Sequence, residues 1–140
     1  MVLKKILLVL TCFIFFIYHA SYAMPTQTPE ALWRTYDLKG QARSVLKFYI
    51  IDGELRADVV KILMSKGHLK NKPYLGMTII RGLKFKNNKW INGEVLDTDT
   101  GNIYSCNITL SHDGQTMHLH AYKGISLFGR TVHWKREPVN

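Results

Sequence analysis

The feature that most constrains this chain is a regular series of short segments in which apolar and polar residues alternate. Residues 102–110 show the pattern most clearly, because every second side chain is apolar and the other face is mostly polar. The apolar face consists of Tyr104, Cys106, Ile108 and Leu110. Asp-Gly pairs at 52–53 and 113–114 mark tight hairpins between such segments. The pattern is typical of half-buried antiparallel strands.

Eight segments of this kind are predicted to be strands, and no segment has a convincing helical period. They are residues 32–36, 43–52, 54–64, 78–86, 89–97, 102–110, 115–122 and 127–136. A meander of eight strands loses its free edges by closing on itself. We therefore expect an all-β fold, an antiparallel up-and-down β-barrel of about eight strands. The apolar phase of the third segment shifts at Val60, which predicts a bulge or bend there.

The N-terminus has the pattern of a cleaved secretory signal peptide. Lys4 and Lys5 precede an apolar run at 6–18, and Ser21 and Ala23 are the small residues that a signal peptidase inspects. The run is shorter than the ~20 residues of a membrane span, so a membrane anchor is the less favoured alternative. We expect no transmembrane span after cleavage and a periplasmic or secreted location. The expected parts are a signal peptide at 1–23, a flexible leader at 24–31 and a barrel domain at 32–137.

The composition of the exported part limits its partners. Without Lys4 and Lys5 it has 17 basic and 10 acidic residues, a formal charge of +7. The basic residues are scattered among the strands, which argues against nucleic-acid binding. Only Cys106 remains after signal cleavage, so no internal disulfide forms and burial must stabilise the domain. Cys106 is expected to be a small buried residue.

The last predicted strand carries two arginines on its apolar face. That face consists of Phe128, Arg130, Val132, Trp134 and Arg136. Because a lone buried charge is costly, each arginine needs a partner, an aromatic plane or a route to water. If the barrel closes, Trp33 of the first strand lies beside this strand, and either Arg130 or Arg136 stacks on its indole. The residues expected to close the barrel are Trp33, Arg130, Trp134 and Arg136.

The chain shows no catalytic or cofactor motif with support. It has no G-x-S-x-G sequence, no H-E-x-x-H sequence and no paired cysteines. His118 and His120 leave one face of a strand, but the opposite parity is apolar, so the pair is expected to point to solvent. We expect no metal site, no cofactor and no enzymatic activity.

Several segments together resemble a known family. They are WRTYD at 33–37, DGEL at 52–55, WINGEVLD at 90–97 with Gly101 and Tyr104, and LFGRTVHWKR at 127–136. They resemble the exported bacterial proteins grouped as domain of unknown function 2147. The resemblance implies a lipocalin-like (calycin) barrel, a periplasmic or secreted location and no established activity. This chain departs from the family pattern at Ala57, at Thr98 and in lacking paired cysteines after Met64.

Three functional hypotheses follow, and the two favoured ones are non-enzymatic. The third, an unrecognised hydrolase, rests only on the general observation that barrels host chemistry in their mouths. The first is a carrier or sensor that takes a small apolar or amphipathic molecule into the barrel. The ligand-binding wall residues expected for it are Phe48, Ile50, Val95, Tyr104, Ile108, Met117, Leu119 and Phe128.

The second hypothesis is a solidly packed interaction module of the cell envelope. It would dock an acidic partner, a lipid head group or a polysaccharide through a basic rim. The rim residues expected for it are Lys66, Lys70, Lys72, Lys84, Lys86 and Lys89. The long connection at 65–76 has no period of either kind, which makes it a candidate lid.

Overall fold

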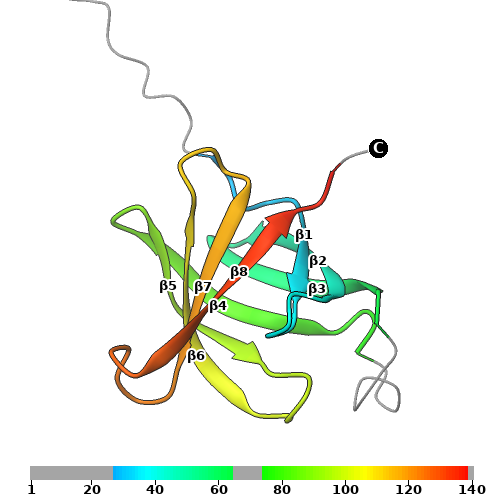
Figure 1. The fold of residues 1–140 in the computed structure, drawn as a ribbon. Helices are drawn as coiled ribbons and strands as arrows, with labels where there is room; N and C mark the ends of the chain where they lie inside the picture. Colours follow the sequence, from blue (N-terminus) through cyan, green and yellow to red (C-terminus); the bar gives the residue numbers. More distant parts are fainter. Residues whose placement is uncertain (1–26, 65–73, 139–140) are drawn as a thin grey trace, which may run out of the picture.

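Alternating apolar and polar residues produce eight antiparallel strands that close into a barrel (Figure 1). The structure is a computed structural model and describes residues 27–64 and 74–138. The strands are β1 (Leu32–Tyr36), β2 (Ala42–Ile51), β3 (Glu54–Ile62), β4 (Thr78–Lys86), β5 (Lys89–Leu96), β6 (Ile103–Leu110), β7 (Thr116–Tyr122) and β8 (Gly129–Arg136). Over the two described ranges, no helix is long and apolar enough to cross a bilayer.

The predicted fold class and the order of the strands are confirmed. Each strand pairs with its neighbours in sequence, and β8 returns to pair with β1. All eight strands lie within two residues of their predicted bounds. The largest differences are at the end of β3 and at the start of β8, where the strand begins at Gly129 and excludes Phe128.

The predicted bulge at Val60 is also confirmed. Leu46 of β2 lies opposite Val59, and Val45 lies opposite Lys61, so Val60 has no partner on β2. The Val60 side chain is exposed. Its insertion restores the inward parity of β3, so Ile62 packs against the core.

A second irregularity, which the sequence pattern did not predict, distorts both β4 and β5. Ile80 and Leu83 are both fully buried although three positions separate them, because the chain turns at Gly82 with a φ of 80°. The backbone N–H of Gly82 donates to the Glu54 carboxylate at 2.7 Å. A Cβ on Gly93 would lie 2.4 Å from the Leu83 Cγ atom, so only glycine fits opposite this turn.

The connections alternate between two ends of the barrel. One end, here called the closed end, carries residues 27–31 and the β2–β3, β4–β5 and β6–β7 turns. The other, here called the open end, carries the β1–β2, β3–β4, β5–β6 and β7–β8 connections. The two ends differ in how their interiors are filled.

Arg136 and Trp33 seal the closed end. They are register partners of β8 and β1, and the Arg136 guanidinium lies 4.6 Å from the centre of the indole ring. The guanidinium also donates to the carbonyl oxygens of Gly114 at 2.9 Å and Thr28 at 3.1 Å. The indole N–H of Trp33 donates to the carbonyl of Pro29 at 2.8 Å. The described end of the leader is therefore bound to the barrel.

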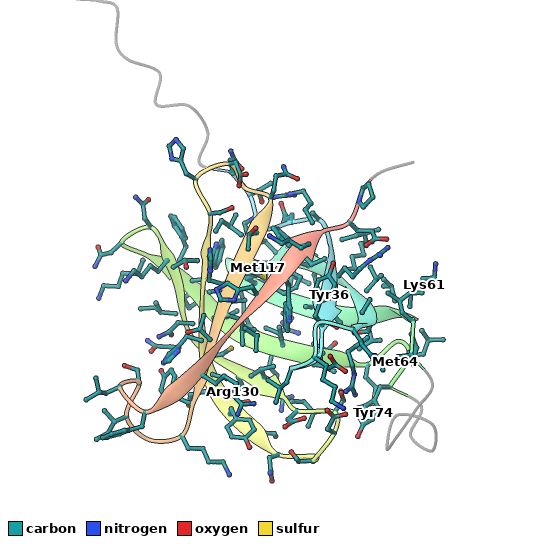
Figure 2. The ribbon with its side chains drawn as sticks, viewed as in Figure 1. Tyr36, Lys61, Met64, Tyr74, Met117 and Arg130 are labelled. Carbon is teal, nitrogen blue, oxygen red and sulfur yellow. The ribbon has the colours of Figure 1, made fainter. Side chains whose placement is uncertain are left out.

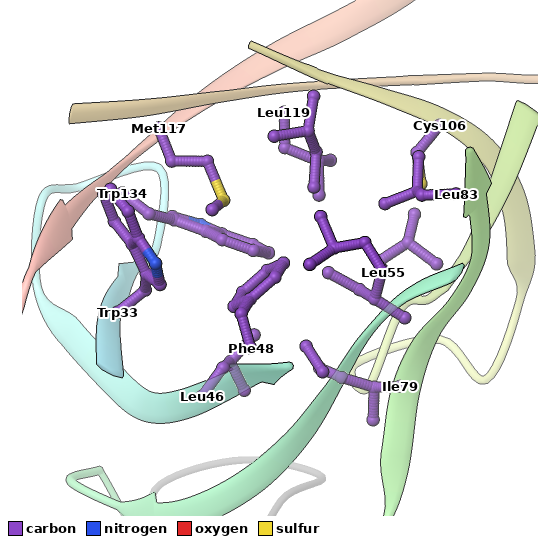
Figure 3. Close-up of a cluster of buried hydrophobic side chains, with 14 of the residues drawn as sticks. Trp33, Leu46, Phe48, Leu55, Ile79, Leu83, Cys106, Met117, Leu119 and Trp134 are labelled. Atoms are coloured by element: carbon purple, nitrogen blue, oxygen red, sulfur yellow. The ribbon is translucent and has the colours of Figure 1, made fainter. Parts of the chain in front are cut away.

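The hydrophobic core fills the closed half of the barrel (Figure 3). Phe48 packs against Trp134 with ring centroids 6.3 Å apart, and Trp33 lies beside them. Met117, Ile108 and Cys106 are fully buried. Every strand contributes to this cluster, so the core is complete between residues 31 and 134. Closed strand pairing and a complete core are what a self-sufficient domain needs.

Replacing Arg136 by alanine should destabilise the barrel. The change removes the stacking on Trp33 and two hydrogen bonds, and we expect the free energy of unfolding to fall by about 1–3 kcal/mol. Urea denaturation followed by tryptophan fluorescence measures this change. Arg130→Ala is the matched control on the same face of β8 and should change stability by no more than about 0.5 kcal/mol. Equal effects of the two substitutions would contradict the assignment of the seal to Arg136.

The thiol of Cys106 should be inert in the folded protein. Burial, with a smaller effect of the Glu94 charge, raises the pKa of Cys106 from an ordinary 9.0 to about 12. We expect Ellman's reagent to leave the native protein unlabelled at pH 8 and to label it after unfolding, because the thiolate is the reactive form. Rapid labelling of the native protein would refute this expectation.

The same shift predicts a pH dependence of stability. As pH rises from about 9 to about 12, the unfolded thiol loses its proton while the folded thiol keeps it. The unfolded state therefore binds fewer protons and stability falls with pH. Cys106→Ala lacks this component, so its urea midpoint should fall less steeply over that range than the midpoint of the unsubstituted protein.

Candidate ligand-binding site

The open half of the barrel encloses a cavity with a volume of about 1140 Å³. Its inner boundary is formed by core residues, among them Val95, Leu119 and Trp134. Its outer boundary is formed by the connections of the open end. The barrel is therefore packed at one end and hollow at the other.

The inner part of the cavity wall is mostly apolar, whereas polar, charged and aromatic residues line the mouth. Val59, Ile79 and Val95 are buried and face it from β3, β4 and β5. Ile62 joins them because the bulge at Val60 turns it inward. Small side chains leave the space open, as Ala121 on β7 does. Such a wall suits an apolar ligand surface, because apolar contacts release water from both sides.

Tyrosines surround the outer part of the cavity. Tyr36 ends β1, Tyr104 lies near the start of β6, and Tyr74 begins the second described range. Tyr74 is almost fully buried, and Figure 2 shows it close to Met64. A tyrosine offers an apolar ring with a polar tip, which suits a boundary between a dry wall and a wet mouth.

An ion pair crosses the mouth. The guanidinium of Arg43 donates to the carboxylate of Asp99. Arg43 belongs to β2, and Asp99 belongs to the β5–β6 turn, so β3 and β4 separate the two in the barrel. The pair therefore joins opposite sides of the opening. A ligand entering the cavity passes beside it.

The other charged residues at the mouth differ in the contacts that they make. The Asp37 carboxylate accepts backbone N–H groups of Lys39 and Gln41 at 2.8 and 2.9 Å, which fixes the β1–β2 turn. The Lys123 ammonium lies 5.1 Å from the centre of the Tyr104 ring. Arg130 borders the cavity from the start of β8, and its guanidinium has no hydrogen bond or ion pair with the described part of the chain. A guanidinium without a partner among these residues can bind a polar or acidic group.

The predicted wall residues divide between the two halves of the barrel. Val95, Tyr104, Leu119 and Phe128 border the cavity. Phe48, Ile108 and Met117 belong to the packed core, and Figure 3 shows Phe48 and Met117 within it. Ile50 lies at the closed end and is 37% exposed. Phe128 is outside the closing strand and lies on the rim, 71% exposed. Ligand contact at all eight positions stays a prediction.

The predicted closure residues are also divided. Trp33, Trp134 and Arg136 meet at the closed end, whereas Arg130 lies at the other end of β8. Antiparallel pairing explains this division, because it brings the start of β1 beside the end of β8. The open choice between the two arginines is thus resolved in favour of Arg136.

The predicted basic rim does not form one described surface. Lys84, Lys86 and Lys89 lie at the closed end around the β4–β5 turn. Lys66, Lys70 and Lys72, with most of the candidate lid at 65–76, lie outside the described residues. The interior is also not packed along its whole length.

The histidines on the outer face make structural contacts. His118 and His133 are register partners whose rings meet edge to face at 4.7 Å. His120 contacts the hydroxyl of Thr131 at 3.0 Å and the carbonyl oxygen of Ser126 at 2.6 Å. Among the residues that the structure describes, no group of three or more metal-ligating side chains comes together.

Several cavity residues were not predicted from the sequence. Tyr36, Ala121 and Val132 have the correct inward or rim position but were not singled out, because strand parity alone does not say which end of a barrel stays hollow. The ion pair of Arg43 and Asp99 joins residues far apart in sequence, so no local pattern announces it. The sequence signal that could have indicated this ion pair is the position of both residues next to turns at the open end.

Comparison with known proteins places the fold and the family. The solved structure of HP1028 from Helicobacter pylori, described as belonging to the lipocalin family, is similar with a TM-score of 0.62 at 15% identity. The match covers 79% of this chain and 84% of that one. A search of curated proteins gave no match. The family described as "Uncharacterized protein conserved in bacteria (DUF2147)" matches residues 31–136. The chain, with its sealed closed end and hollow open end, belongs to this family.

Proposed function

We propose that this protein binds one small apolar or amphipathic molecule in the cavity of its open half. One observation carries the proposal: the interior is hollow at one end and has an apolar wall with a polar mouth. The cavity volume of about 1140 Å³ is slightly above the ~300–1,000 Å³ typical of small-molecule sites. The lipocalin-like fold agrees with such a role, since eight-stranded barrels of this kind have room for one small ligand.

The chemistry of the cavity supports binding more than catalysis. The thiol of Cys106 lies in the core, where its raised pKa keeps it protonated. The carboxylates of Asp37, Asp97 and Asp99 at the mouth accept backbone N–H groups or pair with Arg43. They are therefore committed to holding turns and the ion pair. A carrier or sensor that acts outside the cytoplasm is the role that we infer, with export supported by the N-terminal signal pattern.

Filling the cavity should abolish binding without unfolding the barrel. Ala121→Phe places a ring in the hollow half, and we expect the affinity for the fluorescent probe 8-anilino-1-naphthalenesulfonate to fall at least about tenfold, or ~1.4 kcal/mol. Titration by fluorescence measures the affinity, and thermal melting verifies the fold. Val132→Phe on the neighbouring strand is a second variant, should the first fail to fold.

Thr109→Phe is the matched control, because it adds the same ring to a β6 position of opposite parity to the inward Ile108. It should leave the probe affinity unchanged. Mass spectrometry of a solvent extract from the denatured, freshly purified protein identifies a co-purified molecule. Equal probe binding by Ala121→Phe and the unsubstituted protein, together with a clean extract, would exclude the cavity as a binding site.

A further inference from the structure

The β7–β8 connection exposes three large apolar side chains beside the cavity mouth. Ile125 is 65% exposed, Leu127 is 80% exposed and Phe128 is 71% exposed. Three such residues within four positions form a contiguous apolar tip, here called the apolar loop (residues 125–128). Exposed apolar groups of this kind mark interaction sites, because water contact with them is unfavourable.

The apolar loop is held in a defined shape. The N–H of Phe128 donates to the carbonyl of Ile125 at 3.1 Å, and the carbonyl of Ser126 lies 2.6 Å from Nε2 of His120. Because a carbonyl oxygen only accepts, Nε2 carries the proton. Gly129 lets the strand approach this imidazole, since a Cβ there would lie 2.8 Å from the ring. Figure 1 shows the connection projecting from the barrel at the lower left.

The charged residues that flank the apolar loop in sequence are basic. Lys123 and Arg130 flank it on the two sides. Arg130 has no carboxylate partner in the described ranges, and Lys123 contacts only the face of Tyr104 among the aromatic rings. From residue 114 to residue 136 the chain contains no aspartate or glutamate. The loop thus presents an apolar tip that is flanked in sequence by two basic residues.

We propose that the apolar loop docks the protein on an anionic lipid surface. Ile125, Leu127 and Phe128 insert among the acyl chains, while Lys123 and Arg130 contact the anionic head groups. This combination of apolar insertion and basic flanks is what interfacial membrane binding requires. A second copy fits the loop poorly, because self-association would bring two sets of these basic residues together.

Docking at this loop would also orient the cavity. Phe128 and Arg130 both border the mouth, so the opening would lie next to the head groups. An amphipathic molecule could then pass between bilayer and cavity with little exposure to water. The docking itself does not depend on the proposed function, so the two are tested separately.

Vesicle sedimentation tests the docking. The protein from residue 24 onward, which contains the complete barrel, is mixed with phosphatidylcholine vesicles with and without phosphatidylglycerol. We expect binding to the anionic vesicles, weakened by added salt because the basic flanks contribute. The double variant Ile125→Ser, Leu127→Ser, which changes no residue of the cavity lining, should reduce the partition coefficient at least about tenfold. Lys123→Gln with Arg130→Gln should remove the salt dependence.

Ile51→Ser is the matched control, because Ile51 is 47% exposed at the closed end, on the opposite side of the barrel. It should leave vesicle binding unchanged. Binding that is lost equally with Ile51→Ser, or that survives in the Ile125→Ser, Leu127→Ser variant, would overturn the proposal. So would a concentration-dependent dimer in light scattering that disappears in that variant, because the loop would then bind a second copy. Unchanged probe affinity in the loop variant separates failed docking from a failed cavity.

Discussion

The seal of Arg136 on Trp33 is the contact on which the closed barrel depends. β1 and β8 share only two register pairs, whereas β2 and β3 share eight. So short a ladder leaves little backbone hydrogen bonding at the last seam, and side chains complete it. The Arg136 guanidinium covers the Trp33 indole. Arg34 and Glu137 add a bidentate ion pair with hydrogen bonds of 2.5 and 2.7 Å. Without these contacts β1 would become a free edge.

Sealing one end by side chains concentrates the core there. Trp33, Phe48 and Trp134 fill much of the closed half of the barrel. The interior of the open half holds the cavity. The bulge at Val60 bends the wall around that space. Cavity, ion pair and apolar loop are then all found at the same end. Binding and docking are thus proposed for one face of the molecule and stability for the other.

Strand order, strand bounds and the Val60 bulge follow from local sequence, because alternation and turn chemistry are local signals. The irregularity at Gly82 and Asn92 does not, because two strands deform together and neither shows it alone. Parity identified inward residues but not depth, so Phe48 and Tyr104 appeared equivalent although one lies in the core and the other at the mouth. Depth depends on how the ends of a closed sheet are filled, which is a property of the whole barrel.

The ion pair between Arg43 and Asp99 has a consequence for kinetics. It lies at the opening, so the molecule that we propose as a ligand would pass beside it on leaving the cavity. Asp99 is about half exposed, and dissolved ions therefore compete for it. For the ligand that we propose, the lifetime of the complex would then depend partly on the ionic strength outside, even though most of the cavity wall carries no charge.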